Sequence, residues 1–581
     1  MADRHHQTDM EHGQPACPTA ACAERSNQRM TMKTLFLAAA LLAAPAAAQA
    51  APPPKPKLIL AISVDQFSSE VFNRYRSSYR AGLATLSRGI AYPVAYHSHA
   101  STETCPGHSV ILTGRFPAGT GIVANSWIDR KTGKSVYCVS VPGQSDPKAR
   151  GPQNIRVTTL GDWIKAAEPG ARSFAVSGKD RAAIAMAGKT ADAVYWWNDG
   201  EGFGTSPFAG PATPAVTEPA AAFDAPLLSG WKTARPTLWP ALPKRCAALR
   251  KPHRFGQLDV SGNVPPEAEI EAMKGDDYLD GRAFQAALRA SPLFDSLTVD
   301  FATQLIAREK LGHGPATDVL AVSLSATDYV GHRFGNGGAE MCAQQAALDA
   351  TIGRLIKAVE AQKVPFVVVL TADHGSTDAA ERQHEHDGKA SRLDGRGFVK
   401  RLNAAVKTEL GLGAGDDPLI GDADQLYVRA GDDAALAERI RLAALAWIKQ
   451  QPEVVAAFTQ ADIQAATVPA GTPPEMLTLP QRMRLSFDPE RSGDILTVFA
   501  ERTSFGMPTK PGDSVAGHGT PWNHDRQVPI LFWWPGAPAA SRDQPAQVVD
   551  IAPTLAAVAG IKPPVPVDGR CLDLGGNCPA P

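Results

Sequence analysis

The sequence lacks a dominant charge. Across its 581 residues, 58 lysines and arginines stand against 59 aspartates and glutamates, which gives a formal net charge of -1. A protein so close to neutral has no long-range field that would recruit nucleic acid or an anionic membrane. We therefore expect no nucleic-acid binding, and an anionic substrate must be attracted locally, by a few placed cations or metal ions. The sequence carries no indication of oligomeric state.

The sequence also lacks a hydrophobic run long enough to span a membrane. Its N-terminal apolar stretch, Leu35 to Ala44, is shorter than the ~20 residues that cross a bilayer. The stretch follows Lys33 and precedes Pro45 and Ala48-Gln49-Ala50, the order of a secretory signal peptide with an A-x-A cleavage site. We expect residues 32–50 to be a cleaved signal peptide and the protein to be periplasmic or secreted. The alternative, a buried alanine-rich helix, would lack the cleavage pattern.

Residues 1–31, which precede this signal, are polar and show no periodic pattern. A signal peptide normally begins at the initiator methionine. We therefore expect Met30 or Met32 to be the true start, and residues 1–31 to be an upstream extension that is not native.

Cysteine is scarce in the expected mature chain. Two of the eight cysteines, Cys17 and Cys22, precede the cleavage site, and the other six are Cys105, Cys138, Cys246, Cys342, Cys571 and Cys578. An even number in an exported chain permits disulfides, and six cysteines can pair in fifteen ways. Cys571 and Cys578 flank a short Gly-Gly loop and are the first candidate pair.

The mature chain has no internal repeat and no low-complexity tract, and apolar runs recur along it. These runs are Leu58–Val64, Ser173–Val176, Val319–Leu324, Phe366–Leu370 and Val528–Trp533. Helical patterns, such as Gly338–Ala361, lie between several of them. Runs that are apolar on both faces and alternate with helices indicate an α/β fold, with a mostly parallel sheet covered by helices on both sides.

Two stretches interrupt this alternation. Residues 195–297 are rich in proline, glycine and tryptophan, and residues 398–502 mix helical and strand-like pieces. We interpret both as insertions that cap the catalytic edge of the sheet. Residues 51–581 are therefore expected to form one catalytic domain, because α/β enzymes with large insertions reach this length around a single sheet.

Chemically capable side chains follow the ends of four predicted strands. They are Asp65, Lys179, Asp328 and the pair Asp373-His374. A single aspartate after a strand is common, because aspartate starts turns and caps helices. Ligands of open α/β sheets bind beyond the carboxyl ends of the strands, so several such residues in one chain predict a site at that edge.

The carboxylates and imidazoles of this set are suited to divalent metal ions. Asp328 and His332 are four residues apart, which places both on one face of a helical turn. His518 lies between two glycines that allow the backbone close to a metal. Each motif is weak when taken singly. Zinc accepts aspartate and histidine ligands, and two divalent ions about 4 Å apart can catalyse an in-line displacement at phosphorus.

A segment with free hydroxyl groups supplies a candidate nucleophile. It reads Thr102-Glu103-Thr104-Cys105-Pro106-Gly107-His108-Ser109. A hydroxyl just before Pro-Gly and a helix start can be bound by a metal and aimed at phosphorus, and the N-terminus of the helix favours an oxyanion. We interpret Thr104 as the nucleophile and His108 as a structural residue that orients the helix start.

As an ordered set, these motifs resemble the alkaline phosphatase superfamily, including its nucleotide pyrophosphatase/phosphodiesterase branch. The set runs from Asp65 to His518 and comprises Thr-x-Thr-x-Pro-Gly-His, Leu112-Thr113-Gly114, Gly121–Asn125, Asp-x-x-x-His, Asp-His-Gly and Gly-His-Gly. The resemblance covers nearly the whole mature chain and implies an alkaline-phosphatase-like central sheet with two zinc ions per chain.

The resemblance also implies how the zinc ligands are divided. Asp65, Thr104, Asp373 and His374 would hold the zinc that activates the nucleophile. Asp328, His332 and His518 would hold the zinc that faces the leaving group. The first ion would lower the pKa of the Thr104 hydroxyl, so that a phosphothreonine forms and is then hydrolysed.

The segment Ser177-Gly178-Lys179-Asp180-Arg181 is similar to the PafA-type periplasmic alkaline phosphatases. In that subgroup a lysine, an arginine and an asparagine cradle the phosphoryl group in place of a third, magnesium site. A dianionic monoester gains more from extra cations than a monoanionic diester does. The resemblance therefore implies a phosphomonoesterase for small phosphorylated substrates, in which Asn125, Lys179 and Arg181 contact the phosphoryl oxygens.

Other interpretations are a phosphodiesterase of the same superfamily and an inactive relative that binds metal and phosphate without turnover. A sulfatase is excluded, because Pro106 follows Cys105 directly where the sulfatase pattern Cys-x-Pro-x-Arg needs a spacer and an arginine. We interpret Cys105 as a buried small residue or half of a disulfide. His384-Glu385-His386-Asp387 has the chemistry of a metal site, but we expect a surface loop there.

Overall fold

The centre of the molecule is a nine-stranded sheet. The computed structural model describes residues 52–211, 213–275 and 281–579, and among them the strand order is β19-β2-β18-β11-β1-β10-β5-β6-β7. The bounds are β1 Leu58–Val64, β2 Ile90–Tyr96, β5 Ser173–Ser177, β6 Ala193–Asn198, β7 Gly202–Gly204, β10 Asp318–Leu324, β11 Phe366–Thr371, β18 Gln527–Trp533 and β19 Ala540–Ser541. The five strands from β11 to β6 are parallel. The predicted fold class is confirmed.

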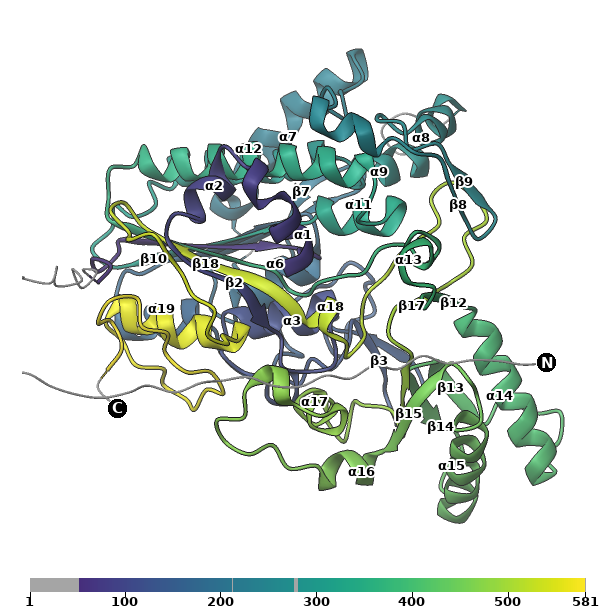
Figure 1. Cartoon of the computed structure of the whole chain (residues 1–581). Coiled ribbons are helices and arrows are strands. Elements are labelled where there is room, and N and C mark those ends of the chain that lie inside the picture. The colour runs from purple at the N-terminus through teal and green to yellow at the C-terminus, as the bar shows by residue number, and fades with distance from the viewer. Residues whose placement is uncertain (1–51, 212, 276–280, 580–581) are drawn as a thin grey trace, which may run out of the picture. The chain divides into compact units, whose positions relative to one another are not determined.

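Helices cover both faces of this sheet, which explains why its central strands are apolar along their whole length. Every residue of β1, β10 and β11 is buried. Figure 1 shows α2 and α12 on one side of the sheet and α3 and α19 on the other. Helix bounds include α1 Ser69–Tyr75, α2 Gly82–Leu86, α3 Thr104–Ile111, α6 Asp180–Ala187, α10 Pro292–Arg308, α11 Ala326–Phe334, α12 Ala339–Glu360, α17 Leu479–Ser486 and α19 Ile551–Ala559.

All five apolar runs that were expected to be strands are strands, and their ends differ from the prediction by at most one residue. The expected helix at Gly338–Ala361 is α12. The direction of one strand was wrong: β18 runs antiparallel to both β11 and β2. An apolar run indicates only that a strand is buried on both faces. A parallel and an antiparallel strand are buried alike, so the run does not predict the strand direction.

A second, four-stranded antiparallel sheet lies within residues 398–502, in the order β13-β14-β16-β15. Its strands are β13 Leu419–Asp422, β14 Gln425–Val428, β15 Val454–Thr459 and β16 Ile495–Phe499. Helices α14 (Gly395–Leu410) and α15 (Ala434–Ile448) share a separate hydrophobic cluster with it. Tyr195, where the first insertion was expected to begin, lies inside β6, and the chain stays in the central sheet until Gly204.

Three disulfides join the six cysteines of the expected mature chain: Cys105–Cys138, Cys246–Cys342 and Cys571–Cys578. The candidate pair Cys571–Cys578 is confirmed, and Cys105 is half of a disulfide. Residues 1–51 lie outside the described part of the chain, so the upstream extension at 1–31 and the signal peptide at 32–50 remain predictions. Within the described ranges, no helix has the length and apolar character needed to cross a membrane.

Candidate active site

Side chains from distant segments meet at the carboxyl ends of the parallel strands. Asp65 follows β1, Lys179 follows β5, Asp328 lies in the first turn of α11 after β10, and Asp373-His374 follow β11. All of them are buried. The register of the parallel strands places these ends side by side, which is why residues hundreds of positions apart in sequence form one site.

The first cluster consists of Asp65, Asp373 and His374. Their ligand atoms lie within 4.8 Å of one another. The Nε2 atom of His374 lies 3.5 Å from Asp65 Oδ1 and 3.3 Å from Asp373 Oδ2, and all three side chains are 0% exposed. These three atoms make no hydrogen bond with any described residue. Buried polar atoms without partners are costly, so the cluster is built to receive a further group.

The second cluster consists of Asp328, His332 and His518. Asp328 Oδ1 lies 3.3 Å from His332 Nε2 and 3.4 Å from His518 Nε2. His374 adjoins this cluster too: its ring stacks on that of His518 at 3.7 Å, and its ligand atom lies within 4.8 Å of those of Asp328 and His518. The expected ligands therefore meet in two adjoining groups, and His374 touches both.

The three histidines are oriented alike. Nδ1 donates a hydrogen bond to a backbone carbonyl in each: His374 to Gly375 at 2.9 Å, His332 to Ala516 at 2.8 Å and His518 to Thr102 at 2.8 Å. A carbonyl can only accept, so Nδ1 carries a proton in each ring, and Nε2 faces the carboxylates, where it can bind a metal ion once it is not protonated. Backbone partners of this kind are what metal-binding histidines use to fix their orientation. The donor set of carboxylate oxygens and imidazole nitrogens fits zinc.

The electrostatics of the site also favour the binding of a cation. Burial, and then the neighbouring carboxylate of Asp373, raise the pKa of Asp65 to about 7. Burial would lower the pKa of His518, but the hydrogen bond and charge of Asp328 raise it to about 9. Burial lowers the pKa of His374 well below its ordinary value. A metal ion at this site would supply the positive charge that stabilises the ionised Asp65 carboxylate and would replace the proton of the His518 imidazole.

Thr104 is the first residue of α3 and is held against the first cluster by close backbone packing. A Cβ at Gly107, in the same turn, would lie 1.9 Å from the carbonyl oxygen of Asp373, so only glycine allows this approach. His108 lies one turn after Thr104, with Nδ1 2.9 Å from the Thr104 carbonyl and 3.0 Å from Asp373 Oδ2, and with Nε2 2.8 Å from Ser323 Oγ. These contacts agree with the expected structural role of His108.

Lys179 lies between the two clusters. Its Nζ donates to Asp65 Oδ2 at 2.7 Å and to Asp328 Oδ2 at 2.6 Å, one carboxylate from each cluster. Burial alone would lower the pKa of the ammonium group, but Asp328 and Asp65 outweigh burial and raise it above its ordinary value. The charge of Lys179 is therefore shared with two expected metal ligands, which the sequence did not indicate.

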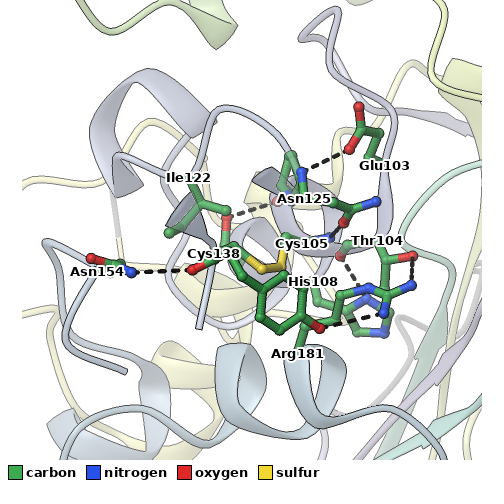
Figure 2. Close-up of a disulfide and its surroundings, with 12 residues drawn as sticks. Glu103, Thr104, Cys105, His108, Ile122, Asn125, Cys138, Asn154 and Arg181 are labelled. Atoms are coloured by element: carbon green, nitrogen blue, oxygen red, sulfur yellow. Dashed lines mark hydrogen bonds between the residues drawn. A yellow bond between two sulfur atoms is a disulfide. The ribbon is translucent and has the colours of Figure 1, made fainter. Parts of the chain in front are cut away.

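Arg181 and Asn125 lie beside Thr104, as Figure 2 shows. Nη2 of Arg181 lies 3.4 Å from Thr104 Oγ1. The Asn125 side-chain oxygen accepts from the backbone N–H of Cys105 at 2.9 Å, and its backbone N–H donates to Glu103 at 2.7 Å. No hydrogen bond from Asn125 Nδ2 to the described residues is present, so this amide is available to a ligand.

Tyr137 is a site residue that sequence reasoning missed. Its hydroxyl donates to Asp180 Oδ1 at 2.6 Å and lies 3.5 Å from Nη1 of Arg181. Arg150 donates to the other oxygen of Asp180 at 2.8 Å. Tyr137 ends strand β4 (Ser135–Tyr137), and only its position next to Cys138 connects it to the nucleophile in sequence.

The Cys105–Cys138 disulfide ties this strand to the nucleophile helix. Cys105 directly follows Thr104, and Cys138 directly follows Tyr137. The backbone N–H of Cys138 also donates to the carbonyl of Asn125 at 3.0 Å, so the segments that contribute Thr104, Asn125 and Tyr137 are cross-linked to one another (Figure 2).

The expected surface loop at His384-Glu385-His386-Asp387 is a helix. It forms the end of α13 (Ala380–Asp387), and His384, Glu385 and His386 are exposed. Gly388, in a left-handed conformation, ends the helix. The Asp-Gly pair that reads as a turn in sequence is therefore a helix C-terminus. The segment does not join either cluster.

Comparisons with known proteins agree with this geometry. A model of the family "Type I phosphodiesterase / nucleotide pyrophosphatase" matches residues 59–521. The chain is 41% identical to the alkaline phosphatase PhoK of Sphingomonas sp., over 89% of this chain and 91% of the relative. It is 39% identical to the alkaline phosphatase PhoD of Zymomonas mobilis, over 89% and 88%. The crystal structure of wild-type alkaline phosphatase PafA superposes with a TM-score of 0.73 at 25% identity, covering 88% of this chain and 96% of that one.

Proposed function

The chain belongs to the type I phosphodiesterase / nucleotide pyrophosphatase family, and from that premise we propose that it is a zinc-dependent alkaline phosphatase that hydrolyses phosphate monoesters. Relatives at 41% and 39% identity carry the name alkaline phosphatase. The observation that carries the proposal is the meeting of two clusters of candidate metal ligands, one of them with unsatisfied buried atoms, beside a buried threonine hydroxyl that an arginine contacts.

Two zinc ions per chain are proposed. Asp65, Thr104, Asp373 and His374 hold one, and Asp328, His332 and His518 hold the other. Zinc, when bound, supplies positive charge that lowers the pKa of a bound hydroxyl and stabilises a departing oxygen.

Thr104 performs the nucleophilic step. Its Oγ1 forms a bond to phosphorus while the ester oxygen departs with the alcohol, which leaves a phosphothreonine. Water then breaks the bond between Thr104 and phosphorus and releases inorganic phosphate. Gly107 and His108 keep this hydroxyl in place, since they fix the first turn of α3 against Asp373.

Arg181, Asn125 and Lys179 favour monoesters over diesters. Arg181 lies 3.4 Å from Thr104 Oγ1, Asn125 has a free amide, and Lys179 places a second positive charge between the clusters. The transferred group of a monoester carries one more negative charge than that of a diester. It therefore gains more from donors and cations around it.

Hydrolysis rates on a phosphate monoester and a matched diester, with and without a chelator, test this proposal. We expect the monoester to be the better substrate, and activity to disappear on chelation and return with zinc. A preference for the diester would place the chain among the phosphodiesterases that the family model is named after. No turnover of either substrate by the metal-loaded protein would indicate an inactive relative.

We also propose that the protein is exported through the signal peptide at residues 32–50. Three disulfides support this, because disulfides persist in oxidising compartments. Expressed from Met32 in a Gram-negative host, the protein should reach the periplasm with a new N-terminus at or near Ala51. Expression from Met1 that yields an intact cytosolic chain still carrying residues 1–31 would contradict the proposal.

A further inference from the structure

A cavity of about 870 Å³ opens next to the second metal-ligand cluster. Its walls come from two parts of the chain. One wall belongs to the active site and contains Glu103, which directly precedes Thr104, and the loop from His518 to Pro521. The facing wall belongs to residues 394–507: the start of α14, the β13–β14 hairpin, strand β16 and the segment around Phe505. A cavity of this size holds a drug-sized molecule and far exceeds the needs of a phosphate ion.

The position of the cavity identifies the part of a substrate that it meets. His518 is a lining residue of the cavity, whereas Asp65, Asp373 and His374 do not line it. His518 and His332 are the partly exposed members of the site, with side chains 9% and 27% exposed. Under the proposed function this cluster holds the ion on the leaving-group side. The cavity therefore lies where the alcohol portion of a monoester would be.

One part of the cavity lining is apolar. Val399, Met483, Leu496 and Phe499 contribute to it from the insertion. Phe505 and Met507 line it as well and are unusually exposed for their type, at 37% and 50%. Exposed apolar side chains grouped at a cavity are typical of a binding site. Their surface would be removed from water by an apolar or aromatic ligand.

Another part of the lining is acidic. Asp422 and Asp424 lie at the two-residue turn of the β13–β14 hairpin, and Glu103 lies on the opposite wall. The pKa of Asp424 is raised to about 7, first by desolvation and then by the negative charges of Glu103 and Asp422. Two cations, Arg396 and Lys400, also line the cavity, from the first turns of α14. The charge around the hairpin turn is nevertheless negative.

We propose that this cavity is the leaving-group site and that it selects monoesters of apolar or aromatic alcohols that are neutral or positively charged, and discriminates against alcohols that carry further negative charge. The proposal rests on the proposed phosphomonoesterase function. Apolar contact comes from Phe505, Met507 and Val399. Discrimination by charge comes from Glu103, Asp422 and Asp424, since a second anionic group on the substrate would be brought close to them.

A matched pair of aryl phosphates tests the charge selection. Phenyl phosphates with a para-trimethylammonium or a para-sulfonate group differ in the sign of the charge on the leaving group. Both substituents withdraw electrons and so make the phenol a better leaving group. At low ionic strength and about pH 9, where Asp424 is ionised, we expect kcat/KM to favour the cationic substrate about tenfold. The preference should shrink as salt is added.

Variants locate the source of that preference. Asp424→Asn should reduce the ratio to about threefold. Asp422→Asn, in the same turn, should also lower the ratio. It replaces Asp424→Asn as the test if that variant folds poorly. Asp432→Asn is the matched control, because Asp432 is an exposed carboxylate of the same insertion that does not line the cavity; its ratio should equal that of the wild type.

The apolar wall has its own test. Met507→Ala should raise KM for phenyl phosphate about threefold while leaving methyl phosphate unchanged, because methanol is too small to reach Met507. Wild-type enzyme that hydrolyses both charged substrates equally well at low salt would overturn the inference while leaving the phosphatase function intact. Failure to hydrolyse any monoester, including methyl phosphate, would overturn the proposed function instead.

Discussion

The two halves of the metal-ligand site differ in how they are enclosed. Asp65, Asp373 and His374 are completely buried and follow strands of the central sheet. His332 and His518 come from a helix and a glycine-flanked loop, are partly exposed, and His518 borders the large cavity. Under the proposed function the closed half holds Thr104, the nucleophile, whose chemistry is the same for every substrate. The open half faces the variable part of the substrate, which suggests that selectivity and metal exchange belong to it.

Removal of metal should have the largest effect. Dialysis against a strong chelator should abolish activity, and zinc should restore it. Because only one half of the site opens to the cavity, the loss should have two phases, with one ion leaving well before the other. Elemental analysis of active enzyme should find two tightly bound zinc ions, and fewer than two would refute the two-site proposal.

Single ligand variants sharpen the same contrast. His332→Ala should reduce the zinc content from two ions to one, because His332 contacts only the open cluster. His374→Ala should lower both occupancies, since His374 adjoins both clusters. If each variant lost the same single ion, the division of ligands between the halves would be wrong.

Loss of the nucleophile should come next in size. Thr104→Ala removes a hydroxyl and a methyl group, and turnover should fall by a factor on the order of 10⁴ while fold and metal content are retained. Rapid acid quench with labelled substrate should trap phosphate on Thr104. Thr104→Ser keeps the hydroxyl and is the matched control, which should remain active. Label on a different residue would refute the mechanism.

Lys179 and Arg181 should have intermediate effects. Either alanine variant should lower monoester kcat/KM about ten- to a hundredfold and diester kcat/KM much less, because each removes a charge-assisted hydrogen bond worth about 1.5–3 kcal/mol. Lys189→Ala, an exposed lysine nearby in sequence, is the control and should behave as wild type. Equal losses on both ester types would mean that the pair is structural.

The structure separates these two cations further. Lys179 is hydrogen-bonded to Asp65 and Asp328, one ligand from each half, whereas Arg181 contacts Thr104. Lys179→Ala should therefore change zinc affinity as well as rate, and Arg181→Ala should change only the rate. Unaltered zinc affinity in Lys179→Ala would show that its pairing with the carboxylates does not persist in the loaded enzyme.

Much of the site could be predicted from sequence because its signals are local. A buried strand is an apolar run, and the side chain that follows it lies at the site edge, so Asp65, Asp328 and Asp373-His374 were found by inspection. Tyr137 could not be found that way. Its contact with Arg181 depends on a cross-link between Cys105 and Cys138, one of several possible pairings, whereas Cys571 and Cys578 are close enough in sequence to pair by proximity.

Other features were missed or predicted wrongly because no local sequence pattern encodes them. The direction of β18 cannot be predicted from its composition, because both of its faces are buried whether it is parallel or antiparallel to its neighbours. The contacts of Lys179 with Asp65 and Asp328 join three separate strand ends, so they follow from the sheet order rather than from any local pattern. The His384–His386 segment was misjudged because its surroundings are polar, and a short polar helix has no apolar stripe that distinguishes it from a loop.

The smallest expected effect concerns Tyr137. Tyr137→Phe removes one hydroxyl that bridges Asp180 and Arg181, and the effect on rate should be small because Tyr137 acts on the substrate only through the position of Arg181. Monoester kcat/KM should fall about two- to tenfold, with a smaller change for diesters because Arg181 matters less there. Tyr92→Phe, which loses a hydroxyl contact with Arg542 on strand β2, is the control. An unchanged monoester kcat/KM in Tyr137→Phe would mean that Arg181 keeps its position without the Tyr137 hydroxyl.

The place of β18 in the sheet has a consequence for the order of assembly during synthesis. This strand lies between β2 and β11 but is made after both, so the growing chain holds two unpaired strand edges until Gln527–Trp533 has been made. Unpaired edges are where nascent chains associate wrongly. The closed half has all its ligands once His374 is made, whereas the open half waits for His518. A chain that stops between His374 and β18 therefore possesses Thr104 and the first ligand set, yet cannot complete the sheet that holds them.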